Sequence, residues 1–258
     1  MSGPLLQVEG LTKVFGGLTA VRDVDFSVAE GEIVGLIGPN GAGKTTLFNM
    51  LAGSSVPTRG RVRFAGEDCT GEPAHAMARR GVTRTFQITS LFPALTAYEN
   101  VLAGTYRTTR RGWVDALFGA RAQAEEEAAA AQRARDVLGF AGLAERAGEL
   151  ADALSYGEQR KLEIAIALAA SPRLLLLDEP AAGLNPDEGQ RLIALIRQIR
   201  ERGTTVLLVE HHMRVVMGVC DRLIVIDHGE KIAEGPPVAV ANDPEVIRVY
   251  LGRETAHA

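Results

Sequence analysis

A glycine-rich segment near the N-terminus has the spacing of a phosphate-binding loop. Residues 38–45 read G-P-N-G-A-G-K-T, which fits the pattern G-x-x-x-x-G-K-[S/T]. Glycines let the backbone turn tightly so that successive N–H groups point at one anion, and a helix that begins here adds partial positive charge. The Lys44 ammonium would hold the terminal phosphates of a nucleotide, and the Thr45 hydroxyl suits Mg²⁺. The loop residues expected to contact the nucleotide are Gly38, Pro39, Asn40, Gly41, Ala42, Gly43, Lys44, Thr45 and Thr46.

Two carboxylates follow a run of aliphatic residues later in the chain. Leu174–Leu177 are four leucines, typical of a strand buried on both faces, and Asp178 and Glu179 come directly after them. Open α/β sheets bind ligands at the carboxyl ends of their strands, so these side chains are expected beside the glycine-rich loop. We expect Asp178 to hold Mg²⁺, directly or through water, and Glu179 to accept a proton from an attacking water. Together the two motifs predict a nucleoside triphosphatase with Lys44 and Glu179 as catalytic residues.

The strands and helices that must position these residues change in character along the chain. The first 65 residues read as short strands separated by Gly-rich turns, and the buried run Ile33–Ile37 leads into the loop. From about residue 74 to 170 the sequence is typical of helices, and after residue 174 strands and helices alternate. Such alternation implies a parallel sheet with helices on its faces. We therefore predict an α/β fold: a P-loop NTPase core of mainly parallel sheet, with an N-terminal antiparallel β part and a helical insertion.

The composition limits the class of protein. The chain has 258 residues, of which 46% are apolar and 23% charged, too apolar for a disordered chain. A formal net charge of −4 argues against a general nucleic-acid binder, and Cys69 and Cys220 lie outside any zinc-ligand spacing. We find no basic and apolar leader segment and no aliphatic run near the ~18–20 residues that span a bilayer. We expect a cytoplasmic protein that reaches a membrane only through a partner.

A third motif narrows the class. Residues 154–159 read L-S-Y-G-E-Q and resemble the L-S-G-G-Q signature of the ATP-binding subunits of ATP-binding cassette (ABC) transporters, with Tyr156 and Glu158 departing from the consensus. The resemblance implies that this segment contacts the γ-phosphate bound by a partner subunit. The residues implied to do so are Ser155, Tyr156, Gly157 and Glu158. Ser155 and Glu158 also have the spacing of a capping box that stabilises a helix start, and we expect both roles.

The resemblance assigns roles to further residues. It implies that Phe15 stacks on the adenine of ATP with Val21 beneath the base, and that Gln87 reaches Mg²⁺ and links the core to the helical insertion. Asn185 lies where the family usually has Asp, although N-P-D-E from this residue is equally a good helix start.

One histidine is expected to contact the γ-phosphate. His211 follows the strand-end acid Glu210, where the family has its switch histidine, but His212 is adjacent and sequence alone leaves some ambiguity. The other histidines are expected to be solvated and to form no metal cluster. These are His75, His228 and His257.

The resemblance extends over nearly the whole chain, so we expect a single ABC ATPase domain over residues 1–258. Residues 1–87 and 166–258 would form the RecA-like core with its β part, and residues 88–165 the helical subdomain that carries the signature. The phrases S-Y-G-E-Q-R-K-L-E-I-A and D-P-E-V-I-R-V-Y-L-G resemble the subgroup that serves branched-chain amino acid uptake. Urea or amide uptake and lipopolysaccharide export are the alternatives within the family.

This assignment implies several partners. They are ATP with Mg²⁺, integral membrane permease subunits, a second ATP-binding subunit that is identical or homologous, and an extracytoplasmic substrate-binding protein. Nucleic acid is not expected, and the protein would be peripheral on the inner face of the cell membrane. Two classes compete with this assignment: a soluble ABC-type ATPase without a transport role, and a regulator that binds ATP without hydrolysing it.

A basic and aromatic element lies outside these motifs, between residues 104 and 121. It is either a short helix packed on the insertion or a segment that leans toward lipid headgroups or the permease. Its residues are Trp113, Val114, Leu117 and Phe118, flanked by Arg107, Arg110, Arg111 and Arg121.

Overall fold

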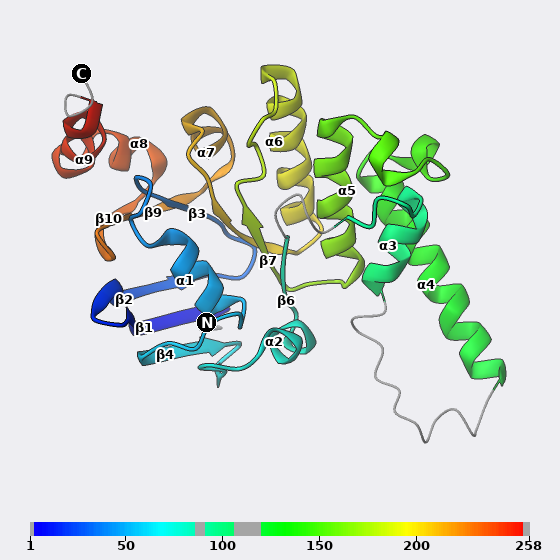
Figure 1. Ribbon diagram of the computed structural model, residues 1–258, viewed down its shortest axis with the longest axis horizontal. Helices are drawn as coiled ribbons and strands as arrows, with labels where there is room; N and C mark the ends of the chain where they lie inside the picture. Colours follow the sequence, from blue (N-terminus) through cyan, green and yellow to red (C-terminus); the bar gives the residue numbers. More distant parts are fainter. Residues whose placement is uncertain (1–2, 86–90, 106–119, 255–258) are drawn as a thin grey trace. The chain divides into compact units, whose positions relative to one another are not determined.

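The computed structural model describes residues 3–85, 91–105 and 120–254 (Figure 1). The chain divides into two compact units, which are described separately below. Unit 1 comprises Met1–Val82 and Arg173–Ala258, and unit 2 comprises Thr83–Pro172. The expected division at residues 88 and 165 stays a prediction.

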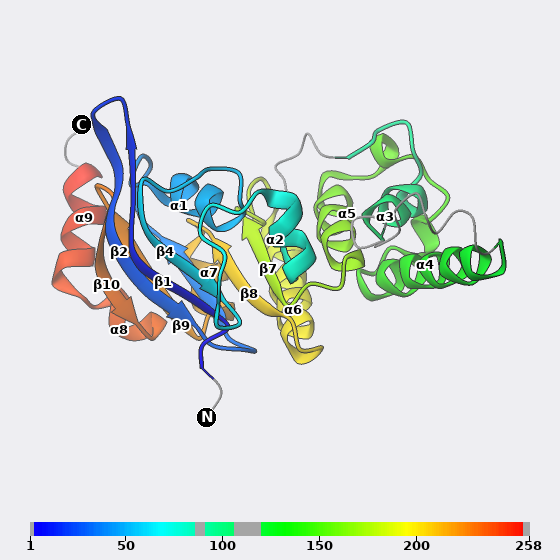
Figure 2. The same ribbon diagram turned by 90° about the horizontal axis from the view of Figure 1, so that it is seen from below.

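Unit 1 begins with an antiparallel sheet, as expected from the sequence. Its strand order is β2-β1-β4-β5, with β1 (Leu6–Phe15), β2 (Leu18–Val28), β4 (Arg59–Phe64) and β5 (Glu67–Asp68). The alternating Val24, Phe26 and Val28 of β2 are buried, because successive side chains of a strand point to opposite faces. β1 and β2 form the long hairpin of Figure 2, which turns through Gly16 and Gly17 at positive φ.

The second sheet is mainly parallel and holds the functional loops at its carboxyl edge. Its order is β10-β9-β3-β8-β7-β6, with β3 (Ile33–Ile37), β6 (Val82–Arg84), β7 (Leu174–Asp178), β8 (Thr205–Val209), β9 (Arg222–Asp227) and β10 (Glu230–Gly235). β3 pairs in parallel with β8 and β9, β7 with β8, and β10 is antiparallel to β9. Every residue of β3, β7 and β8 is buried, as expected for strands covered on both faces.

Six helices complete the described part of unit 1. They are α1 (Lys44–Leu51), α2 (Ala74–Arg80), α6 (Pro186–Glu201), α7 (Met213–Val219), α8 (Pro237–Ala241) and α9 (Pro244–Glu254). Residues of both sheets share one hydrophobic core with Leu47, Phe48 and Leu51 of α1. This shared core fixes the start of α1, and with it the glycine-rich loop, against both sheets. Cys69 and Cys220 are free and buried, and burial raises the pKa of the Cys220 thiol to about 12.

After the end of β6, the described part of unit 2 is helical, which confirms the predicted helical insertion. Its α-helices are α3 (Ala97–Thr105), α4 (Ala120–Phe140) and α5 (Tyr156–Ala169), with short 3₁₀ turns at Ala144–Arg146 and Ala151–Ala153. These helices enclose a separate core that includes Val101, Leu138 and Leu162. Among the described residues of the whole chain, no helix has both the length and the hydropathy that crossing a membrane requires.

Candidate functional site

The glycine-rich loop lies between the end of β3 and the start of α1, in the context that its motif requires. Gly38 has φ +150° and an added Cβ would lie 2.0 Å from the carbonyl oxygen of Ile226, while at Gly43, with φ +102°, it would lie 2.4 Å from that of Ala20. Any side chain at either position would therefore push the loop away from β9 or β2. Gly43 is also the N-cap of α1 and provides no side-chain cap. The first N–H groups of the helix thus have no capping side chain and suit an anion.

The Lys44 ammonium is held directly over this loop. The side chain is buried, and its Nζ donates hydrogen bonds to the carbonyl oxygens of Gly38 at 2.7 Å and Pro39 at 2.9 Å. A buried ammonium keeps its charge only where such acceptors surround it. Lys44 is therefore placed so that its charge faces the space that the loop encloses.

Loop residues 40–46 line a cavity of about 320 Å³, and residues from three other parts of unit 1 line it as well. The remaining lining residues are Leu18, Thr19, Ala20, Glu179 and His228. Phe15 is the last residue of β1, in the β1–β2 hairpin that also provides Leu18, Thr19 and Ala20. Phe15 is half exposed, whereas Val21 is fully buried. Their assignment to the adenine base stays a prediction.

Asp178 and Glu179 reach the same edge of the sheet from β7. Asp178 is the last residue of the strand, is buried, and pairs in register with Val209 of β8. Glu179 has φ +46°, an uncommon backbone conformation for a residue other than glycine, and its N–H donates to the carbonyl oxygen of Val209 at 2.9 Å. After this turn, Glu179 lines the cavity. Asp178 is the buried last residue of β7 and is not among the lining residues.

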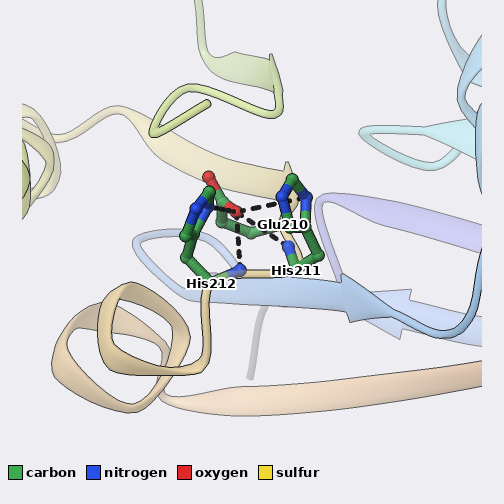
Figure 3. Close-up of side chains that lie close together, drawn as sticks. All are labelled: Glu210, His211 and His212. Atoms are coloured by element: carbon green, nitrogen blue, oxygen red, sulfur yellow. Dashed lines mark hydrogen bonds and ion pairs between the residues drawn. The ribbon is translucent and has the colours of Figure 1, made fainter. Parts of the chain in front are cut away.

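The two adjacent histidines have different neighbours. His211 Nδ1 lies 3.8 Å from Glu179 Oε1 and also 3.8 Å from Glu210 Oε2. His212 Nδ1 lies 3.1 Å from Glu210 Oε2 (Figure 3). His211 is therefore the histidine that faces the proposed base, and His212 is turned toward Glu210. This placement supports His211 as the residue of the proposed site.

Glu210 is a fully buried carboxylate whose hydrogen bonds hold two loops together. Its Oε1 accepts from the Ala181 N–H at 2.9 Å, in the loop that follows Glu179. Its Oε2 accepts from the N–H groups of His211 at 2.7 Å and His212 at 2.9 Å. The donor atoms of Glu210, His211 and His212 lie within 4.8 Å of one another, but a metal ion would have to displace N–H donors that already satisfy the carboxylate. We interpret Glu210 as the residue that fixes His211 relative to Glu179.

The donor set of the cavity fits a triphosphate with a divalent cation. The uncapped start of α1 and one ammonium provide positive charge, and the Thr45 hydroxyl that lines the cavity is a hard oxygen ligand. The Asp178 carboxylate is a further hard ligand, buried at the end of β7 one residue before the lining residue Glu179. A Cβ at Gly38 or Gly43 would disturb the fold of the loop. The loop therefore keeps a bare backbone, which lets a phosphate approach its N–H groups closely.

The signature segment begins α5 in unit 2. Ser155 is the N-cap, and its side chain and that of Glu158 each accept from the other's backbone N–H, which confirms the predicted capping box. The hydrogen bonds from Ser155 are the main reason that the pKa of Glu158 is lowered. The Tyr156 hydroxyl accepts a hydrogen bond from Arg160 at 2.9 Å, and Arg160 pairs with the buried Glu163. These contacts order the exposed start of α5.

The remaining predicted residues are a helix cap, a glutamine, the basic and aromatic element, and a histidine. Asn185 caps α6 in a capping box with Glu188, which confirms the helix start. Gln87 and residues 106–119, with most of the basic and aromatic element, lie outside the described residues. His228 is solvated as expected, with its side chain 81% exposed, and it also lines the cavity. The D-H-G sequence signals a turn here, but the fold alone brings this turn to the cavity.

The chain matches known family models over most of its length. The model described as "ABC transporter" matches residues 21–182, and the model described as "Branched-chain amino acid ATP-binding cassette transporter" matches residues 230–256. The high-affinity branched-chain amino acid transport ATP-binding protein BraF of Pseudomonas aeruginosa is 47% identical over 253 residues, covering 98% of this chain and 99% of that protein.

Solved structures of this class share the fold. An ATP-binding cassette of an ABC transporter in its ADP conformation is 30% identical, with a TM-score of 0.85 and coverage of 97% of this chain and 99% of the solved one. A dimeric ATP-binding cassette in a post-hydrolysis state, bound to ADP and Pi, is 28% identical with a TM-score of 0.75, covering 90% and 98%.

Proposed function

Since this chain belongs to the ABC transporter family, as an ATP-binding protein of the branched-chain amino acid transport type, we propose that it hydrolyses ATP in the cavity of unit 1 to drive uptake of these amino acids. The observation that carries the proposal is the convergence of Lys44, Glu179 and the glycine-rich loop on this one cavity. Phosphate-binding and proton-accepting groups thus lie within reach of one substrate.

Binding relies on the backbone of the loop. The triphosphate of ATP would lie against the N–H groups at the start of α1, with the Lys44 ammonium on the β- and γ-phosphates. Phe15 would stack on the adenine, with Val21 supporting the base. Asp178, Thr45 and Gln87 would hold Mg²⁺, which when bound neutralises part of the phosphate charge.

Hydrolysis needs a base beside the γ-phosphate. Glu179 would accept a proton from a water molecule as the water oxygen forms a bond to the γ-phosphorus. The bond between that phosphorus and the bridging oxygen breaks, and ADP leaves with the electron pair. His211, 3.8 Å from Glu179, would contact the γ-phosphate and keep the carboxylate oriented.

The complete site would include a second subunit. The dimeric cassette that resembles this chain supports a pair of subunits. The pair would be arranged head to tail, formed by two copies or by one copy and a homologue. Ser155, Tyr156, Gly157 and Glu158 of each subunit would then close over the ATP held by the other. ATP favours the closed pair, and loss of the γ-phosphate releases it. The pair would act on permease subunits at the inner face of the membrane, with an extracytoplasmic protein that delivers the amino acid.

Reconstituted transport tests this function. Vesicles that contain the permease, this chain and internal Mg·ATP should accumulate labelled leucine when the substrate-binding protein is added outside, because hydrolysis drives the permease cycle. The measurement is leucine uptake together with phosphate release. Uptake of labelled urea or an amide in place of leucine would overturn the substrate assignment, while phosphate release without ATP-dependent uptake of any of them would overturn the transport role.

Glu210→Gln is expected to reduce the turnover number more than the affinity for ATP. The amide would turn an N–H group toward N–H donors, so that at least one hydrogen bond that orients His211 or the Ala181 loop is lost. Leaving a buried donor unpaired costs about 1–3 kcal/mol, so we expect kcat to fall about 10-fold while the Kd of ATP changes less than about twofold.

A matched variant separates positioning from general destabilisation. Glu188→Ala removes a carboxylate of the capping box of α6, so it should lower the melting temperature with little effect on kcat. If Glu210→Gln likewise changed the melting temperature and left kcat unaltered, the positioning role would be wrong.

A further inference from the structure

The turn between β9 and β10 places His228 at the cavity that we assign to ATP. The turn comprises Asp227, His228, Gly229 and Glu230, far in sequence from the glycine-rich loop. His228 is nevertheless one of the residues that line the cavity, together with Ala20 and Gly43. No role at this site follows from the motifs of the sequence.

This turn is attached firmly to the phosphate-binding loop. The Gly229 N–H donates to the carbonyl oxygen of Ala42 at 2.9 Å, and the Gly229 carbonyl accepts from the Arg22 N–H at 2.8 Å. A Cβ added at Gly229 would lie 2.8 Å from the carbonyl oxygen of Ala20. One backbone hydrogen bond to the loop, one to β2 and the close approach to β2 therefore set the position of the His228 backbone.

His228 has a backbone conformation that is uncommon for residues other than glycine. His228 has φ +46° and Gly229 has φ +83°, a pair of values that hairpin turns usually fill with Asn-Gly or Asp-Gly. The imidazole is 81% exposed, with Nε2 3.8 Å from an Asp227 carboxylate oxygen, so burial does not explain its presence. An uncommon conformation at the rim of a ligand cavity is a reason to infer function.

We propose that His228 is a further nucleotide-binding residue, whose imidazole ring contacts the ribose and α-phosphate end of the nucleotide through a ring nitrogen. Glu179 and Thr45 mark the γ-phosphate end of the cavity. The turn instead approaches Gly43 and Ala20, and Ala20 belongs to β2 of the hairpin that also carries Phe15. The inference rests on the proposed function, because it assigns the cavity to ATP.

Two substitutions at this position test the contact. His228→Gly removes the imidazole and relieves the positive φ, so the turn should persist and the melting temperature should not fall. We expect the Kd values of Mg·ATP and Mg·ADP, measured by titration calorimetry on the full chain, to rise by similar factors of about 5 to 10. His228→Gln keeps an N–H donor on a side chain of similar reach and should stay within about twofold of the unmodified chain.

The controls identify which idea fails. His75→Ala alters another exposed histidine, on α2, and should leave both Kd values unaltered. If the unmodified chain bound ATP and His228→Gly bound it equally well, the inference about His228 would be wrong while the proposed function stood. A rise for ATP alone would overturn the assignment to the α-phosphate end. Absence of ATP binding by the unmodified, folded chain would overturn the proposed function itself.

Discussion

Glu179→Gln is expected to abolish most ATP hydrolysis while ATP binding persists. Glutamine has the size of glutamate and can occupy the same cavity position, but its amide cannot accept the proton of the attacking water. Loss of a general base costs about 10²- to 10⁴-fold in rate, and we expect kcat to fall by that factor. Because the carboxylate itself repels phosphate, the Kd of Mg·ATP should stay equal or decrease slightly. Phosphate release and calorimetric titration measure the two quantities.

The same variant tests the proposed dimer. With hydrolysis blocked, ATP should hold two subunits together, so size-exclusion chromatography with Mg·ATP should show a dimer that separates when ADP replaces ATP. Glu245→Gln is the matched control, because Glu245 is an exposed carboxylate on α9 paired with Arg248, and this variant should hydrolyse ATP at the unmodified rate. Ordinary turnover by Glu179→Gln would mean that another group is the base.

The conformation of Glu179 explains why this position is sensitive. Its positive φ is maintained by the hydrogen bond from its N–H to Val209 and by the one from Ala182 to its carbonyl oxygen. Glu210 then holds Ala181 and His211 in the adjacent loops. The proposed base therefore depends on contacts between β7 and β8 that no single motif contains.

The sequence patterns of short segments predicted two parts of the site, the glycine-rich loop after β3 and the carboxylates at the end of β7. The buried run before Gly38 predicts β3, and the glycines at 38 and 43 are the residues that the close contacts with Ile226 and Ala20 require. The four leucines before Asp178 likewise predict β7 and the edge at which Glu179 emerges. In each case the backbone preference and the hydrophobic pattern agree over fewer than ten residues.

The remaining features depend on pairing between distant strands. His211 and His212 are equivalent by spacing, and only the approach of Glu179 from β7 distinguishes them. The D-H-G turn reads as a solvated hairpin turn until β9 pairs with β3, which brings His228 to the cavity. The burial of Glu210 has the same origin, because its Oε1 partner Ala181 is 29 residues away in sequence. Sequence patterns report local structure and contain no direct signal for such contacts.

Lys44→Ala is expected to remove ATP binding as well as hydrolysis. The ammonium is buried and held by the carbonyl oxygens of Gly38 and Pro39, so a triphosphate meets a charge that is already in place. Two of the three N–H groups of the ammonium are held by these carbonyls, so we count one hydrogen bond from Lys44 to phosphate. A hydrogen bond to a charged group contributes about 1.5–3 kcal/mol, so its loss corresponds to a rise of about 10- to 10²-fold in Kd. Calorimetric titration with Mg·ATP measures this, and phosphate release should fall with it.

The controls for Lys44→Ala distinguish a general loss of charge from loss of this contact. Lys231→Ala removes an ammonium that pairs with Glu234 on β10, and its Kd should stay within about twofold of the unmodified chain. Lys44→Arg keeps the charge, but a planar guanidinium cannot occupy the space of an ammonium that two carbonyl oxygens enclose at 2.7 and 2.9 Å. It should therefore fail to restore binding. Unaltered binding of ATP by Lys44→Ala would mean that the triphosphate binds elsewhere. If Lys44→Ala loses ATP binding and Glu179→Gln keeps it, then Lys44 is the group that holds ATP and Glu179 the group that hydrolyses it.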